Sequence, residues 1–207
     1  IQLVGDNVAE VSCDPDKRLP VTDPFDRQIT IGFGTFLEIT HIAAAERGYA
    51  MEMTPFPDGE AQPRLERSPV ARLKFVQSEA VETDLLFTAI TQRRSNKQVY
   101  DLARKVKDIQ LETVVLDGGA WSADPDFVSR LREQILIAID TEMTTPNANM
   151  ESVDLMRIGY GEIDANPDGI DLSGSMIEAG KLAGQISREQ LADPQSQASR
   201  IGREQLA

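Results

Sequence analysis

The chain is organised around the stretch Thr91-Gln92-Arg93-Arg94-Ser95-Asn96-Lys97-Gln98-Val99-Tyr100-Asp101. Three cations and one hydroxyl fall within five positions of it: Arg93, Arg94, Ser95 and Lys97. An apolar segment, residues 85–90, predicts a helix that leads directly into them. Guanidinium and ammonium groups give charged donors to phosphate and carboxylate oxygens, and a serine hydroxyl adds a neutral donor. The pattern predicts an anion cradle for the phosphate and ring oxygens of a cofactor.

A solvated helix end is the alternative interpretation of the same stretch. Basic residues near the C-terminus of a helix complement its dipole. Runs of charge usually lie on solvated faces, so composition alone favours this alternative.

A family resemblance shifts the balance towards the cofactor. Residues 93–97 followed by Tyr100-Asp101 resemble the signature that opens the nitroreductase family, which is a helix, then Arg-Arg/His-Ser-x-Arg/Lys, then an aromatic-Asp pair. The rest of the chain resembles its Acg-type branch, in which two nitroreductase-like repeats are fused. The segments that carry this are Asp14-Pro15-Asp16-Lys17-Arg18-Leu19-Pro20, Asp23-Pro24-Phe25-Asp26-Arg27-Gln28 and Met150-Glu151-Ser152-Val153-Asp154-Leu155-Met156-Arg157-Ile158-Gly159.

The resemblance implies an α+β fold, a nitroreductase-like antiparallel sheet flanked by helices, with FMN between two halves. Residues 1–78 would be the C-terminal part of a first repeat and residues 79–207 the N-terminal part of a second. The flavin contacts would be Arg93, Arg94, Ser95 and Lys97. In this arrangement Arg93 and Lys97 hold the phosphate or the pyrimidine edge, Ser95 donates a hydrogen bond, and no catalytic acid or base is required.

The implied activity is an FMN-dependent oxidoreductase that uses NAD(P)H to reduce nitroaromatic or quinone-like acceptors, working as a homodimer. A non-catalytic FMN-binding or sequestering protein is one alternative, and a degenerate scaffold that binds no flavin is another. We expect a partial chain, because the family's Asn-Thr-Gln-Pro-Trp-like segment and its last glycine- and alanine-rich helix and strands have no counterpart in this sequence.

The charge and hydropathy of the chain argue against some classes of partner. The 207 residues carry a formal net charge of -13, which argues against nucleic acid because phosphate binding needs a concentrated basic face. No apolar run approaches the roughly 18 residues of a membrane span. We expect a cytoplasmic protein. Since the first residue is Ile1, the chain looks processed or partial, and any export signal would precede it.

Local patterns predict the other elements. A hairpin is expected within residues 1–13, a largely buried helix over 27–48, and strands over 50–56 and 70–76. Further helices are expected over 106–115, from Asp124-Pro125 onward, over 150–159 and over 176–184. The helix after Pro125 presents an apolar stripe, predicted as core or subunit contact: Phe127, Leu131, Ile135, Ile139 and Met143.

The sequence gives only weak indications of a metal site or of a reactive thiol. Residues 164–169 read Asp-Ala-Asn-Pro-Asp-Gly, like the start of an EF-hand loop, but Ser175 stands where the bidentate glutamate belongs. We therefore expect a tight loop there. The single cysteine, Cys13, is predicted to be a small buried hydrophobe, and the single histidine, His41, to be structural.

Overall fold

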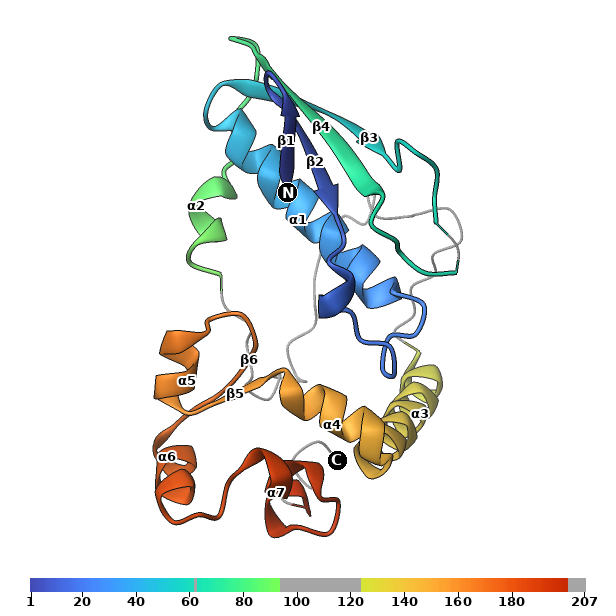
Figure 1. The fold of residues 1–207 in the computed structure, drawn as a ribbon, viewed down its shortest axis with the longest axis vertical. Coiled ribbons are helices and arrows are strands. Elements are labelled where there is room, and N and C mark those ends of the chain that lie inside the picture. The colour runs from blue at the N-terminus through green and yellow to red at the C-terminus, as the bar shows by residue number, and fades with distance from the viewer. Residues whose placement is uncertain (62, 94–123, 201–207) are drawn as a thin grey trace. The chain divides into compact units, whose positions relative to one another are not determined.

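The computed structural model describes residues 1–61, 63–93 and 124–200. The chain divides into two compact units, Ile1–Asn96 and Lys97–Ala207. The described residues combine helices with an antiparallel sheet (Figure 1), so the predicted α+β class is confirmed. The division into repeats at residues 78 and 79 stays a prediction, and the helix predicted over 106–115 lies outside the described residues.

The first unit is built on a four-stranded antiparallel sheet. Its strands, in the spatial order β1-β2-β4-β3, are β1 (Gln2–Gly5), β2 (Val8–Ser12), β4 (Pro69–Gln77) and β3 (Tyr49–Pro55). The predicted hairpin and both predicted strands are therefore confirmed. The long strand β4 lies at the centre, where it pairs on both sides.

The alternation along β4 decides which face of the sheet is buried. Ala71 and Leu73 are buried, whereas Arg72 and Lys74 are exposed. On the exposed face Arg72 lies opposite Glu10, with 2.6 Å between Nη2 and Oε1. Lys74 lies opposite Glu52 of β3, with 3.1 Å between Nζ and Oε2. Because exposed ion pairs contribute little free energy, these two pairs act mainly to favour this strand register.

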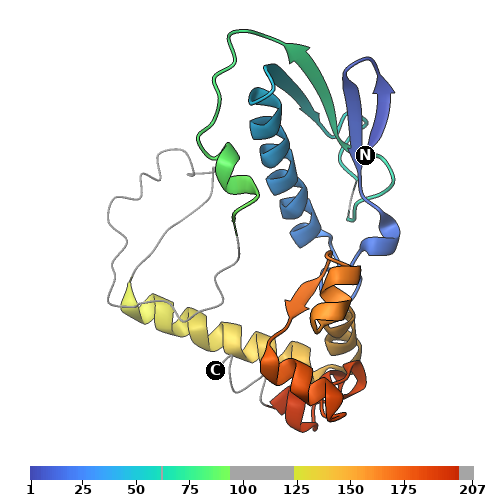
Figure 2. The same cartoon turned by 90° about the vertical axis from the view of Figure 1, so that its left-hand side faces the viewer.

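Helix α1 (Arg27–Ala45) packs on the other face of the sheet (Figures 1 and 2). Its side chains Ile29, Phe33 and Leu37 pack against a buried cluster. That cluster consists of Val11, Cys13, Leu65, Val70, Ala71 and Leu73. Cys13 is buried as predicted, and burial, followed by the charge of Asp26, raises the pKa of its thiol.

The prediction that this helix is largely buried is wrong. Only Ile42, Ala44 and Ala45 of α1 are buried, and the side chain of Ile31 is 61% exposed. His41 is exposed as well. The sequence is apolar around most of the helix, but a single sheet covers one side of it. The exposed apolar side chains of α1 are Ile31, Phe36 and Ile39.

Two aspartates fix the entry into α1. The carboxylate of Asp23 accepts hydrogen bonds from three consecutive helix N–H groups: Arg27 (2.8 Å), Gln28 (2.9 Å) and Ile29 (3.1 Å). Asp26 adopts a left-handed backbone with φ 53° and makes no side-chain cap. Its Oδ2 accepts instead from Leu65 N (2.9 Å) and Arg18 Nη1 (3.3 Å). Asp23 is therefore the residue whose side chain caps α1.

The second unit is mainly helical. Its elements are α3 (Pro125–Thr144), α4 (Pro146–Asp154), β5 (Met156–Ile158), α5 (Tyr160–Ala165), β6 (Ile170–Leu172), α6 (Ser175–Leu182) and α7 (Arg188–Ala192). Asp124 caps α3 through a 2.8 Å bond from Phe127 N, as its place before Pro125 predicts. The short helix predicted over 176–184 is confirmed as α6.

The helix predicted over 150–159 is only partly correct. It ends at Asp154 as part of α4, and residues 156–158 form strand β5, which pairs in parallel with β6. Val153 and Ile158 are almost fully buried. Asn149 ties α4 to α7, since its Nδ2 donates to Ala192 O at 2.8 Å. A parallel partner 14 residues further along leaves no local signal, so periodicity alone favoured a helix.

The apolar stripe of α3 is exposed within the described structure. Phe127, Leu131 and Ile135 are 46%, 47% and 48% exposed. The stripe is therefore not core of the described part of this unit, and its role as a subunit contact stays a prediction. Among the described residues, no helix combines the length and the apolar character needed to cross a membrane.

We predict that Asp23→Ala lowers the free energy of unfolding by about 1–2 kcal/mol, because it removes the cap of α1 from three buried or half-buried N–H groups. Urea unfolding followed by circular dichroism measures the change. Glu38→Ala, on the exposed side of the same helix, is the matched control and should cost a few tenths of that value. Equal losses in the two variants would contradict the role assigned to Asp23.

Candidate functional site

The basic stretch begins directly after α2 (Phe87–Ile90). The turn before this helix is held by Asp84, whose Oδ1 accepts from Leu86 N at 2.7 Å, but α2 itself has no side-chain cap. The backbone of Arg93 closes it with a bond from its N–H to Ala89 O at 2.8 Å. Helix α2 is a single turn, shorter than the apolar segment predicts, and Leu85 before it is 93% exposed.

The structure describes one of the four predicted flavin contacts. Arg93 is exposed at the end of the turn that follows α2. Arg94, Ser95 and Lys97 lie outside the described residues. The donor set suits the phosphate of FMN chemically, because it joins guanidinium, ammonium and hydroxyl donors within five positions. The convergence of these four side chains on one FMN molecule stays a prediction.

A second polar cluster, in the second unit, was missed by sequence reasoning. It surrounds Glu162 of α5. The Oε2 of Glu162 accepts from Ile158 N at 3.0 Å and from Arg188 Nη2 at 2.8 Å. Arg188 Nη2 also donates to Met156 O at 2.8 Å. Lys181 donates to Ile158 O, and its Nζ lies 3.5 Å from Glu162 Oε1. We call Glu162, Lys181 and Arg188 the Glu162 cluster.

The electrostatics of the Glu162 cluster indicate a structural role. The hydrogen bond from Arg188 comes first and that from Ile158 N second in lowering the pKa of Glu162 to about 2. The same pairing raises the pKa of Arg188. General acid–base catalysis at neutral pH needs a pKa near 7. Glu162 therefore stays ionised and holds the end of β5 against α7.

The glycine at position 159 lets the side chains of Glu178 and Lys181 approach the end of β5 closely. Gly159 has φ 84°, a conformation that favours glycine. A Cβ atom there would lie 2.7 Å from Glu178 Oε1 and 2.9 Å from Lys181 Nζ. Glu178 accepts from Tyr160 N at 2.7 Å, so the chain leaving β5 is bonded on both sides. No spacing in the sequence predicts these contacts, because the partners come from three different helices.

One of the two aspartates of the EF-hand-like segment binds an arginine. Asp168 Oδ1 accepts from Arg157 Nε at 3.1 Å and from Arg157 Nη2 at 2.9 Å. Within the described ranges, no group of three or more histidine, cysteine or acidic side chains is arranged to hold a metal ion.

No protein-family model, no curated protein and no solved structure matches this chain. The motif at residues 93–97 and the chemistry of the described side chains are therefore what indicate a function. One cavity of the first unit lies between β1 and α1, and Arg93, the flavin contact that the structure describes, does not line it.

We predict that Glu162→Gln lowers the free energy of unfolding at pH 7 by about 1–2 kcal/mol, a value reduced by solvent screening of the half-buried pair. The pKa of Glu162 is lowered on folding, from 4.5 to about 2. Its contribution is thus fully present above pH 4.5 and disappears as the pH falls towards 2. The difference between wild type and variant in urea unfolding should shrink from pH 7 to pH 3. Glu133→Gln, on the exposed surface of α3, is the control. A difference that grows on acidification would contradict this assignment.

Proposed function

We propose that this protein binds FMN and is a nitroreductase-like oxidoreductase. The observation that carries the proposal is the run of anion donors at residues 93–97, which opens with the exposed Arg93 directly after α2. The motif resemblance adds the cofactor's identity. The chain has a net charge of -13, so a cluster of three cations is a local exception that a phosphate would exploit.

The roles of the chain's own residues follow from their donors. Arg93 and Lys97 would hold the phosphate or the pyrimidine edge, Arg94 would supply a further cation, and Ser95 would donate a neutral hydrogen bond. Bound FMN would supply hydride and electron transfer between NAD(P)H and a nitroaromatic or quinone-like acceptor. The protein would contribute position and electrostatics, so no acid or base of suitable pKa is needed.

We predict that Arg93→Ala weakens FMN affinity by about 1–3 kcal/mol, the scale of a lost charge-assisted hydrogen bond. This corresponds to a dissociation constant raised by about 5- to 150-fold. Titration of FMN followed by its fluorescence measures the change. Arg67→Ala, an exposed arginine of the same unit, is the control and should leave the affinity unchanged. An unaltered dissociation constant for Arg93→Ala would refute the site assignment.

The oxidoreductase and a flavin-sequestering protein give different kinetic results. We expect the FMN-loaded protein to oxidise NADH or NADPH faster when menadione or a nitroaromatic is added, which absorbance at 340 nm records. A protein that retains FMN without any NAD(P)H turnover would be a flavin-binding protein and not an enzyme. A protein that retains no FMN would overturn both flavin functions and leave the scaffold.

A further inference from the structure

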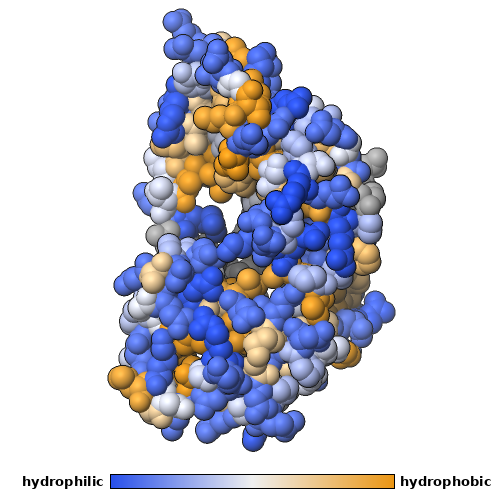
Figure 3. Space-filling model, in the orientation of Figure 1, coloured by the Kyte–Doolittle hydropathy of each residue, from blue (hydrophilic) through white to orange (hydrophobic). Residues whose placement is uncertain are grey.

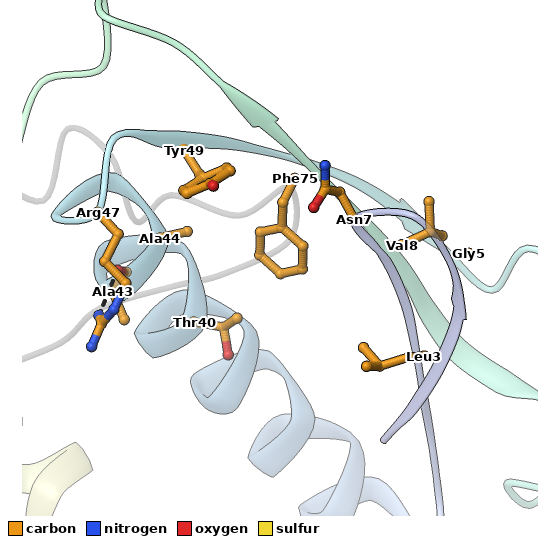
Figure 4. Close-up of a pocket in the computed structure, with 10 residues that line it drawn as sticks. All are labelled: Leu3, Gly5, Asn7, Val8, Thr40, Ala43, Ala44, Arg47, Tyr49 and Phe75. Carbon is orange, nitrogen blue, oxygen red and sulfur yellow. Dashed lines mark hydrogen bonds between the residues drawn. The ribbon is translucent and has the colours of Figure 1, made fainter.

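The first unit contains a cavity of about 460 Å³ between the β1–β2 hairpin and the second half of α1. In Figure 4, Phe75 of β4 and Leu3 of β1 point into this space, and Thr40 faces them from the helix. Val8 and Ala44 complete the apolar walls. Figure 3 shows apolar side chains gathered on the visible surface of this part of the unit.

Among the described residues, no side chain fills the space between the walls of this cavity. Leu3 is 81% exposed although it projects towards α1. Apolar side chains that face solvent here would gain free energy if a ligand covered them. The volume lies towards the small end of the range for ligand pockets, which are mostly apolar with few polar groups. The space therefore suits a small planar or short-chain apolar group.

The positive charge of Arg47 determines which polar group the ligand should carry. Among the described residues that line the cavity, Arg47 is the one with a charged side chain, and none is acidic. Its Nη1 donates to Ala43 O at 3.0 Å, which fixes the guanidinium at the end of α1 (Figure 4). A guanidinium has further N–H donors suited to a carboxylate. Its full positive charge exceeds the roughly half negative charge at a helix C-terminus, so an anion is favoured at this rim.

We propose that this cavity binds a small amphipathic carboxylate, with an aromatic or short aliphatic body between Leu3, Thr40 and Phe75 and its carboxylate at Arg47. Of the proposed flavin contacts, the one that the structure describes, Arg93, does not line this cavity, so the two sites can be tested separately.

Isothermal titration calorimetry of the full chain with 2-naphthoate, and with the neutral 2-naphthamide, tests the proposal. We expect 2-naphthoate to bind with a dissociation constant on the order of 0.1–1 mM, as its size allows, and the amide to bind about tenfold more weakly. Arg47→Gln should weaken the carboxylate about tenfold and leave the amide unchanged. Arg67→Gln is the control for loss of an exposed cation in the same unit.

A second variant fills the space. Thr40→Phe should abolish binding of both ligands, while Thr35→Phe, which makes the same change on an exposed position of α1, should preserve it. Circular dichroism verifies that both variants keep the fold. Absence of naphthoate binding to wild type, equal binding by Thr40→Phe, or an affinity for the carboxylate unaffected by Arg47→Gln would each overturn the proposal.

Discussion

The first unit depends on two buried carboxylates at the entry of α1. A buried charge is costly unless hydrogen bonds satisfy it, and both aspartates are satisfied. Asp23 binds the first N–H groups of the helix, and Asp26 binds Leu65 N and Arg18. The bond to Leu65 spans 39 residues and brings that side chain into the cluster under α1. The left-handed backbone of Asp26 is strained for a non-glycine residue, and these bonds offset the cost.

The position of α1 against the sheet leaves part of its apolar surface exposed. The sheet covers one side of the helix, so the other side carries exposed Ile31, Phe36 and Ile39. At the C-terminal half, the hairpin stands away from the helix and the cavity opens between them. Apolar surface left in water forgoes about 25 cal/mol for each Å² that could be buried. The proposed carboxylate ligand would recover part of that free energy, with Arg47 deciding which end of it faces solvent.

Charged side chains have different roles in the Glu162 cluster and at residues 93–97. In the second unit, Glu162, Lys181 and Arg188 are bonded to one another and to the backbone of β5, so their charges stabilise a fold. Residues 93–97 contain three cations and no acidic residue, which is the pattern expected of a binding site for an anion. The pKa of Glu162, about 2, supports the structural role of its cluster. A carboxylate with such a pKa carries no proton to exchange at neutral pH.

The sequence by itself determined the elements whose signals are local. The strand over residues 70–76, the hairpin within residues 1–13 and the helix start at Asp124-Pro125 each depend on a pattern of a few residues, and each prediction was confirmed. The donor set at residues 93–97 was also read from sequence, although Arg93 alone of the four lies in the described part. Only the tertiary structure decided that Asp23 caps α1, that residues 156–158 form a strand, and that Glu162 meets Arg188. The pairing of β5 with β6 and the Glu162–Arg188 pair join residues that sequence spacing does not relate. Folding brings these residues together through backbone pairing and burial, and the free energy of their contacts exists only once the chain has folded.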